Sequence, residues 1–324
     1  DDKLKDNQMH YVLLDEVQLV EEFEDVLNSY LQMDNVDVYV TGSNARFLSK
    51  DIITAFRGRG LEVRVHPLSF REIRGARPDE SMEQLWIEYM TYGGLPQVQT
   101  MTSAQERVDY LKGLFTHTYL KDIKERHHIK WDDDLEELIR ILASTIGGLT
   151  NPRKLADTFR TVKKSALSQS TIKEYLDFLQ DAFIIERALR YDIKGKELLK
   201  TQEKFYLSDV SLLYAVLGYA DQKISGVLEN IVFLELKRRR YNVYIGKFGT
   251  KEIDFIAEKQ GAKLYIQVAY KLESQETASR EFSPLLEIRD QYPKFVVTMD
   301  EFWQENVEGI KHFYIADFLL NKEY

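Results

Sequence analysis

Two adjacent acidic residues close a short apolar run near the beginning of the sequence. The run is Tyr11–Val17 (YVLLDEV), in which Asp15 and Glu16 follow four largely hydrophobic residues. Such a pair can divide the work of nucleotide hydrolysis: the aspartate holds Mg²⁺, directly or through a water, and the glutamate orients and polarises the attacking water. The alternative is a pair of acids at a strand-to-helix turn, where they cap the following helix.

The elements that would position this pair have the order of a parallel α/β sheet. Tyr11–Val17 is expected to be a buried strand, because both of its faces are apolar. In such sheets the functional residues lie at the carboxyl ends of the strands, and Asp15 and Glu16 occupy this position. The remaining elements are expected to alternate as helix, strand, helix and strand, at Glu21–Gln32, Val36–Asn44, Leu48–Phe56 and Leu61–Phe70.

Two further stretches supply residue types that nucleotide chemistry uses. Thr41-Gly42-Ser43-Asn44 ends the second expected strand, where a polar side chain can contact the attacking water or the γ-phosphate. Phe56–Gly60 (FRGRG) places Arg57 and Arg59 beside glycines. An arginine presented to the nucleotide of a neighbouring subunit would stabilise transition-state charge. The alternative for both arginines is a solvated loop.

The order LLDEVQ, VTGSN, FRGRG and HPLSFREI, followed by TYGGLP, GVLENIVFLEL and EIDFIA, resembles a group of bacterial and archaeal AAA-family ATPases. Members of that group carry a C-terminal domain of unknown function, and the resemblance covers essentially the whole chain. It implies ATP and magnesium as cofactors, and self-association if an arginine finger acts between subunits. It also implies roles for individual residues: magnesium ligand (Asp15), water activation (Glu16), sensor (Ser43 or Asn44) and finger (Arg57 or Arg59).

The sequence departs from this group in one large respect. The phosphate-binding loop G-x-x-x-x-G-K-[ST] occurs nowhere in it, although the loop and its strand should precede Asp15. The chain therefore looks like a protein that lacks its first segment. Because the backbone nest and the lysine of that loop supply most of a phosphate site, we expect this chain alone to bind ATP weakly.

The pattern divides the chain into four expected parts. The remainder of the ATPase core occupies residues 1–75, and a helical lid, inferred from the resemblance, occupies residues 76–130. Residues 131–215 predict a winged helix, because three helical stretches precede two strands joined through Lys194-Gly195-Lys196. Residues 216–324 predict an α/β domain like that of restriction endonucleases.

The winged helix is a candidate for nucleic-acid binding. Its recognition-type helix would begin at Ser168 or Ser170 and present Lys173, while Lys194 and Lys196 lie in the wing. The stretch from Arg153 to Lys204 holds 12 basic and 8 acidic residues, a mild surplus for a DNA-binding module. The alternative is a winged helix that serves as a protein–protein spacer, and the sequence leaves both open.

The C-terminal part has the layout of the PD-(D/E)XK nuclease fold, a helix followed by strands that carry Asp and then Gln. Glu229, Asp254 and Gln267 are the candidate metal ligands. Ala269 stands where this chemistry needs a lysine to steady the nucleophile. Lys271, two residues further on, is a candidate substitute. The alternative, a nuclease-like fold without cleavage, is favoured by the missing lysine.

Composition limits the remaining function classes. The net charge of −9 gives no overall attraction for nucleic acid, so any binding must come from local basic patches. No membrane partner is expected, because no run of 18 apolar residues occurs. The absence of cysteine fits a cytoplasmic protein. We therefore expect a nucleotide-dependent motor or switch with a DNA- or protein-binding C-terminal half; the alternatives are an ATP-regulated, metal-dependent DNA nuclease and a non-catalytic scaffold.

Overall fold

The computed structural model describes residues 8–17, 20, 22–42, 60–129, 132–163, 167–218 and 224–324. The chain forms two compact units. One comprises Asp1–Val65 with Phe178–Phe183, and the other comprises His66–Asp177 with Ile184–Tyr324. The mixed α/β class expected from the sequence is confirmed, with a small parallel sheet in the first unit and a large mixed sheet in the second. No helix of the described residues is long and apolar enough to cross a membrane.

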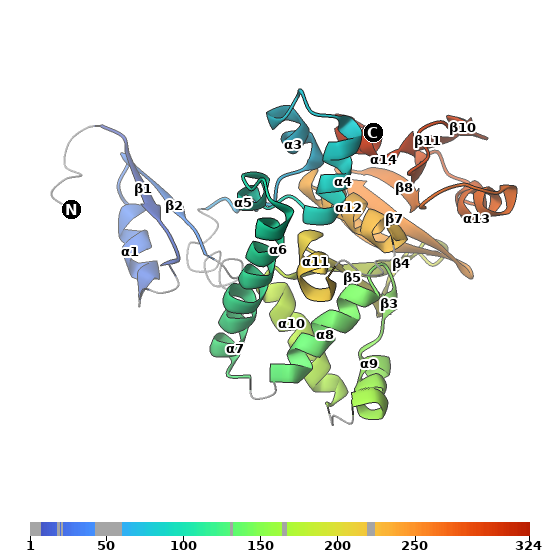
Figure 1. Cartoon of the computed structure of the whole chain (residues 1–324). Coiled ribbons are helices and arrows are strands. Elements are labelled where there is room, and N and C mark those ends of the chain that lie inside the picture. Colours follow the sequence, from blue (N-terminus) through green and yellow to red (C-terminus); the bar gives the residue numbers. More distant parts are fainter. Residues whose placement is uncertain are drawn as a thin grey trace. The chain divides into compact units, whose positions relative to one another are not determined.

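Within residues 8–42, as far as the structure describes them, the first unit forms two parallel strands with a helix between them (Figure 1). Strand β1 (His10–Leu14) pairs in register with β2 (Val36–Val40). Helix α1 (Phe23–Tyr30) connects them, and its Phe23 and Leu27 are buried with Val17 against the sheet. This is the expected strand–helix–strand unit, in which the crossover helix covers one face of the sheet.

The third strand expected at Leu61–Phe70 is wrong. Residues 60–69 form no strand, and helix α3 (Phe70–Ala76) begins where the strand was expected to end. Ser69 caps this helix, because its hydroxyl accepts from the Glu72 amide while the Glu72 carboxylate accepts from the Ser69 amide. This reciprocal pair is a strong helix start and outweighs the alternating apolar pattern before it. The helix expected at Leu48–Phe56 lies outside the described residues.

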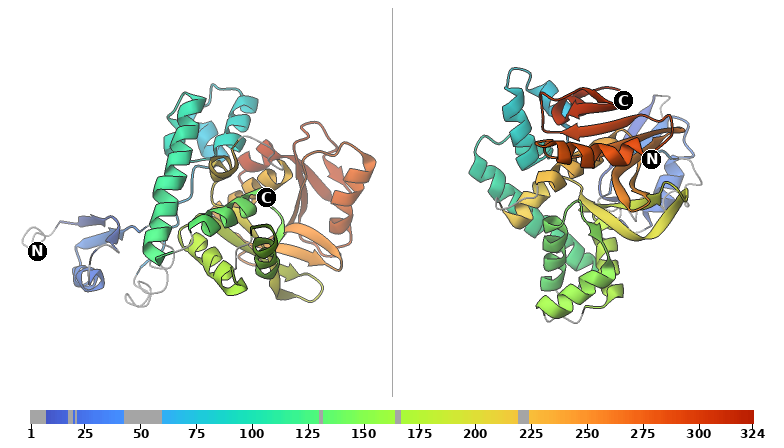
Figure 2. Two further views of the ribbon diagram at one scale, coloured as in Figure 1. Left: turned by 60° about the horizontal axis from the view of Figure 1, so that its bottom comes forward. Right: turned by 90° about the vertical axis from the view of Figure 1, so that its right-hand side faces the viewer.

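Helices make up most of the described chain from residue 70 to residue 217. In the part expected as a helical lid, helices α6 (Ala104–Gly113) and α7 (Lys121–His127) are joined by a π-helical turn, η4 (Leu114–Leu120). Figure 2 shows α8 and α9 grouped at one end of the second unit, away from the C-terminal strands. The bounds are α4 (Met82–Tyr92), α5 (Pro96–Gln99), α6 (Ala104–Gly113), α7 (Lys121–His127), α8 (Asp132–Ser144), α9 (Pro152–Thr158), η5 (Phe159–Lys163), α10 (Gln169–Asp181) and α11 (Ser211–Leu217).

The second unit is organised by one nine-stranded sheet in the order β10-β11-β9-β8-β7-β6-β4-β5-β3. Around its centre, β6 and β7 pair antiparallel, β7 and β8 antiparallel, and β8 and β9 parallel. The bounds of the strands are β3 (Leu149–Thr150), β4 (Ile185–Asp192), β5 (Glu197–Leu207), β6 (Asn242–Phe248), β7 (Lys251–Lys259), β8 (Ala262–Val268), β9 (Lys294–Thr298), β10 (Asn306–Val307) and β11 (Ile310–Tyr314).

The hairpin expected as the wing is continuous with this sheet. Strands β4 and β5 form the hairpin, and β4 also pairs in parallel with β6, with Leu189 opposite Tyr244. A free wing would have a solvated outer edge, whereas this one is joined to the C-terminal strands by main-chain hydrogen bonds. The hairpin therefore belongs structurally to both of the parts that the sequence pattern separates.

Three helices complete the C-terminal core. Helix α12 (Ile224–Arg238) packs through Phe233 against Tyr206 and Phe255, with ring centroids 4.5 and 6.1 Å away. Helix α13 (Gln275–Leu286) shares a buried cluster with Ile253 and Tyr265. Helix α14 (Ile315–Leu320) follows β11 and contacts α3. Helix α12 thus packs against Tyr206 and Phe255, and α13 packs against Ile253 and Tyr265. These contacts bury the centre of the sheet.

The glycines of the TYGGLP stretch are fixed by close backbone approaches. Gly93 ends α4 at φ 67°, and a Cβ there would lie 1.8 Å from Asp209 Oδ1. A Cβ on Gly94 would lie 2.0 Å from the Leu68 carbonyl oxygen, while the Gly94 amide donates to Asp209 Oδ2 at 2.8 Å. Asp209 follows β5, so this stretch ties α4 to the end of the large sheet. Its role in the described structure is therefore packing.

Candidate functional site

Two groups of polar side chains lie at strand ends, one in each unit. In the first unit, Asp15 directly follows β1 and Thr41 directly follows β2. The Thr41 hydroxyl donates to Asp15 Oδ1, and the Glu16 amide donates to Thr41 Oγ1 at 3.2 Å. Because parallel strands end at the same edge of a sheet, the two turns meet there. Glu16 takes a positive φ of 51°, which turns the chain sharply after the strand.

This geometry bears on only part of the expected nucleotide site. Asp15 and Glu16 stand together at the carboxyl edge, and the polar residue that contacts them from the next strand is Thr41. The expected sensor residues, Ser43 and Asn44, and the expected finger residues, Arg57 and Arg59, lie outside the described residues. The catalytic and magnesium-binding roles of all these residues stay predictions.

In the second unit, the three residues expected as metal ligands are brought together. The Asp254 amide on β7 donates to Gln267 Oε1 on β8 at 3.3 Å, because the two residues continue the antiparallel register of Phe255 with Ile266. Lys204 on β5 links Asp254 to Glu229 on α12. Its Nζ lies 3.2 Å from Glu229 Oε2 and 3.8 Å from Asp254 Oδ1.

A local irregularity in β7 directs Asp254. Gly246 pairs with Ile253 and Tyr244 with Ile256, so β7 has one residue more than β6 across the segment that contains Asp254 and Phe255. Bulges of this kind occur beside functional sites, where they change the direction of a side chain. Asp254 Oδ2 then accepts from the Val268 amide of β8 at 2.8 Å.

Sequence reasoning missed the centre of this site. Lys204 is almost completely buried, with 2% of its surface exposed, and its ammonium also lies 2.8 Å from Glu252 Oε1. Tyr206, two residues further along β5, donates from its hydroxyl to Glu229 Oε2 at 3.2 Å. The alternation of β5 places both side chains on one face. The available signal was a lysine and a tyrosine two residues apart at the end of β5, where Lys204 directly precedes the apolar residues Phe205–Leu207.

Burial and charge shift the pKa values of this cluster. Burial raises the pKa of Glu229, reinforced by the Asp254 carboxylate and opposed by Lys204. Burial likewise raises the pKa of Asp254 to about 6, while Lys204 and the Val268 amide act in the opposite direction. Burial lowers the pKa of Lys204, but the three surrounding carboxylates outweigh it, so that the net shift is upward. Lys204 is therefore a permanent cation at neutral pH.

The two residues expected around the missing nuclease lysine lie as follows. Ala269 is buried directly after β8, where its amide donates to the Val297 carbonyl at 3.0 Å. Lys271 is exposed, and its Nζ lies 5.3 Å from the ring centroid of its neighbour Tyr270. The described contacts of Lys271 are thus away from Asp254 and Gln267. The lysine that does reach Asp254 is Lys204.

Three lysines were expected to contact nucleic acid. Lys173 on α10 is exposed, as are Lys194 and Lys196 in the turn between β4 and β5. The Lys194 ammonium lies 4.4 Å from the centroid of the Phe248 ring. The Lys194 and Gly195 amides both donate to Asp192, at 3.0 and 2.9 Å, which fixes the turn. Their role in nucleic-acid binding stays a prediction.

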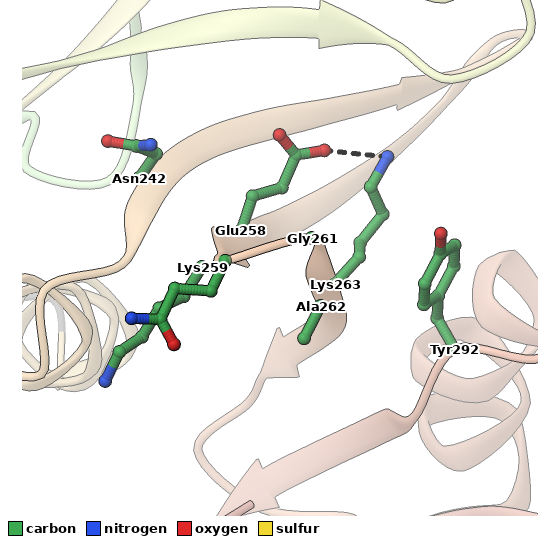
Figure 3. A pocket seen from close by; sticks show the side chains of 8 residues that line it. Asn242, Glu258, Lys259, Gly261, Ala262, Lys263 and Tyr292 are labelled. Carbon is green, nitrogen blue, oxygen red and sulfur yellow. Dashed lines mark ion pairs between the residues drawn. The ribbon is translucent and has the colours of Figure 1, made fainter.

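A shallow pocket of about 300 Å³ lies at the β7–β8 turn (Figure 3). Glu258 and Lys263 face each other across it, with Lys263 Nζ 2.8 Å from Glu258 Oε1, and Tyr292 borders the far side. The pocket is thus lined by an ion pair that is already formed. Asp254 and Gln267 are not among its lining residues, so it is separate from the buried cluster.

Comparison with known proteins places the chain among relatives of unassigned activity. Residues 2–74 match the family model of an AAA domain, and residues 83–223 match a domain of unknown function (DUF8612). An uncharacterized protein of Haemophilus influenzae is 38% identical over 314 residues, which are 96% of this chain and 77% of that protein. The chain belongs to the same family as this protein.

A second relative is an uncharacterized protein of Methanocaldococcus jannaschii, MJ1544. It is 27% identical over 81% of the chain, which spans 61% of the archaeal protein's own length. Among solved structures, protein VC1899 from Vibrio cholerae aligns with 96% of the chain and 89% of its own, with 12% identity and a TM-score of 0.24. That likeness is too low to support a common fold. The AAA domain match supports nucleotide binding by this family in general terms.

Proposed function

We propose that the chain is the greater part of an AAA-family ATPase that acts as a nucleotide-dependent motor or switch. The observation that carries this proposal is the match of residues 2–74 to an AAA domain, in which Asp15 and Glu16 follow the first described strand. The Thr41 hydroxyl supports it further, because a hydrogen bond that orients a carboxylate at a strand end is what a magnesium-holding aspartate needs. The substrate would be ATP bound with Mg²⁺, and the bond hydrolysed would be that to its γ-phosphate.

The exposed side of the small sheet also favours a larger nucleotide-binding core. Parallel sheets in α/β proteins are covered on both faces. Among the described residues of the first unit, α1 covers one face, while Tyr11, Leu13 and Tyr39 are 63%, 76% and 54% exposed. Side chains of this size are expected to be covered in the active form of the protein, either by further strands and helices or by another subunit.

The test is ATP hydrolysis by two forms of the protein. The 324-residue chain should release phosphate no faster than the buffer, because its sequence holds no phosphate-binding loop. A form that also carries such a loop ahead of Asp15, taken from the gene or from a longer relative, should turn over ATP. Turnover by the shorter chain would contradict the proposal, as would a lack of nucleotide binding by the longer form.

For the C-terminal half we propose a nuclease-like fold that binds nucleic acid or protein without cleaving it. The order α12-β6-β7-β8-α13-β9 supports this proposal, because it follows the helix–strand layout expected from the sequence. The meeting of Asp254 with Gln267 supports it as well. The helices α8, α9 and α10, with the β4–β5 hairpin, are proposed as a winged helix that contributes to the same binding surface.

An ATP-regulated, metal-dependent nuclease is the second candidate, favoured by the same three side chains. The discriminating assay incubates plasmid and single-stranded DNA with the protein and Mg²⁺ or Mn²⁺. We expect no cleavage, because the motif has alanine at position 269, where this chemistry needs a lysine. Cleavage that Asp254→Asn abolishes, while Lys271→Ala leaves it intact, would establish nuclease chemistry with a lysine other than Lys271.

A further inference from the structure

We propose that the Lys204 ammonium takes the place that a metal ion holds in a cleaving nuclease, so that a built-in cation organises this site and no divalent metal binds there. The inference rests on the proposal that the C-terminal half has a nuclease-like fold. It concerns a residue outside the expected motif, contributed by the hairpin that precedes the domain.

The first argument is the position of the ammonium. Lys204 Nζ lies 2.8 Å from Glu252 Oε1, 3.2 Å from Glu229 Oε2 and 3.8 Å from Asp254 Oδ1. These carboxylates come from β7 and α12, the same elements that would supply ligands to a metal. An ammonium is compact and strongly attracted to carboxylates. It therefore neutralises the negative charge that would otherwise attract a divalent ion.

The second argument is that two further oxygens of the expected ligands, Asp254 Oδ2 and Gln267 Oε1, already accept hydrogen bonds. Asp254 Oδ2 accepts from the Val268 amide, and Gln267 Oε1 accepts from the Asp254 amide. Gln267 Nε2 donates to Glu281 Oε2 at 3.0 Å, which turns the amide oxygen away from the carboxylates. Within the described ranges, no three His, Cys, Asp or Glu side chains are arranged to hold a metal ion. With the Lys204 ammonium among these carboxylates, the donor set therefore does not fit Mg²⁺ or Mn²⁺, which need several converging oxygens free to bind the metal.

The third argument is that Lys204 is held in place. It is 2% exposed, and its backbone pairs with Ala188 on β4 and Leu149 on β3. The backbone that carries this side chain is therefore fixed by pairing on both sides. Removal of one partner from such a buried ion pair leaves uncompensated charge, which is strongly unfavourable. A metal would have to displace a cation that the fold itself supplies.

The test measures Mn²⁺ binding without nucleotide, by calorimetry and by electron paramagnetic resonance. All variants carry Asp15→Asn, so that the expected ATPase site contributes nothing and the result does not depend on the ATPase proposal. With Lys204 intact, no Mn²⁺ site that depends on Asp254 should appear. Lys204→Met keeps the length of the side chain without its charge, and it should bind Mn²⁺ more tightly by about tenfold or more. Adding Asp254→Asn should remove that gain.

Two results would overturn the proposal. One is Mn²⁺ binding with Lys204 intact that Asp254→Asn abolishes, which needs no variant at Lys204 and remains decisive if Lys204→Met does not fold. The other is a folded Lys204→Met protein that gains no Mn²⁺ site. Lys204→Arg is the matched control: it retains the cation, and it should remain as free of Mn²⁺ as the Lys204 protein. ATP hydrolysis by the longer form is measured separately, so failure of either proposal leaves the other open to its own test.

Discussion

Lys204 and Glu229 are 25 residues apart, and their side chains meet with Nζ 3.2 Å from Oε2. The sequence pattern assigns Lys204 to a winged helix and Glu229 to a nuclease-like domain. The ion pair, together with the β4–β6 pairing, joins the two through buried contacts. The hairpin and the acidic residues of the C-terminal half therefore share one cluster of buried ion pairs.

Glu16→Gln in the form with a phosphate-binding loop should trap bound ATP and lower turnover by about 10²-fold or more, because the amide cannot polarise the attacking water. Phosphate release and nucleotide retention on the protein are the measurements. Glu22→Gln, a nearby acid outside the expected site, is the control and should hydrolyse normally. Equal rates for Glu16→Gln and the parent would remove Glu16 from the mechanism.

Gly93→Ala should lower the free energy of unfolding by about 2–4 kcal/mol, since the new methyl meets Asp209 and the backbone angles suit glycine alone. Gly93 has φ 67° and ψ −157°. Gly113→Ala is the matched control: nothing lies within 4 Å of a Cβ there, and alanine should add about 0.5–1 kcal/mol in the helix. Urea denaturation measures both. A neutral Gly93→Ala would show that the approach of Asp209 is not required.

Asp209 should make stability fall as pH rises. Burial raises its pKa above the ordinary 3.8, although the Ser211 and Gly94 amides and Arg238 oppose the shift. The folded protein then holds a proton that the unfolded chain releases, so the unfolding free energy decreases from the unfolded pKa up to the folded one.

The comparison is the slope of unfolding free energy against pH, from about pH 4 to about pH 7, with and without Asp209→Asn. The slope should be less negative in the variant, even if its overall stability is lower, because the amide side chain introduced by this substitution cannot titrate. The groups that face Asp209, including Tyr89, Tyr119 and Arg238, are unchanged in the variant. Identical slopes would mean that Asp209 contributes no proton uptake.

Nucleic-acid binding by the proposed winged helix should be weak, non-specific and strongly dependent on salt. The local basic surplus is mild and the whole chain carries a charge of −9, so released counterions must supply the affinity. Fluorescence anisotropy with labelled duplex DNA measures it at low and physiological salt. Lys173→Ala with Lys196→Ala should weaken binding, whereas Lys112→Ala on α6 should not. Affinity that is independent of salt would contradict this mechanism.

The elements with strong local patterns were predicted well from the sequence. Helix α1 and strand β2 lie within the stretches expected at Glu21–Gln32 and Val36–Asn44, and β1 overlaps the strand expected at Tyr11–Val17. The exception is Leu61–Phe70, where the expected strand did not take account of the capping pair of Ser69 and Glu72 that begins α3. A side-chain cap decides such a segment, since it provides hydrogen bonds that an isolated third strand would lack.

The candidate site was predicted in its motif residues but not in its centre. The register of β7 and β8 could be inferred from their short connection, so Asp254 was expected beside Gln267. Lys204 reaches Asp254 only because β4 pairs with both β5 and β6. The spacing of the strands along the chain does not reveal this order in the sheet. From the sequence alone, a lysine in a strand is also expected to be exposed. Burial of its charge requires nearby carboxylates, and here these come from distant parts of the sequence.

The pairing of β4 with β6 also determines how this protein folds during synthesis. The β4–β5 hairpin leaves the ribosome early and can form at once, because its partners are adjacent in sequence. Its second edge must wait until Asn242–Phe248 has been translated, at least 50 residues after β4 ends. During that interval β4 offers unpaired main-chain groups, and Lys204 still lacks its carboxylate partners on β7, which is translated after β6. A nascent chain halted before β6 is therefore the form of this protein most in need of a chaperone.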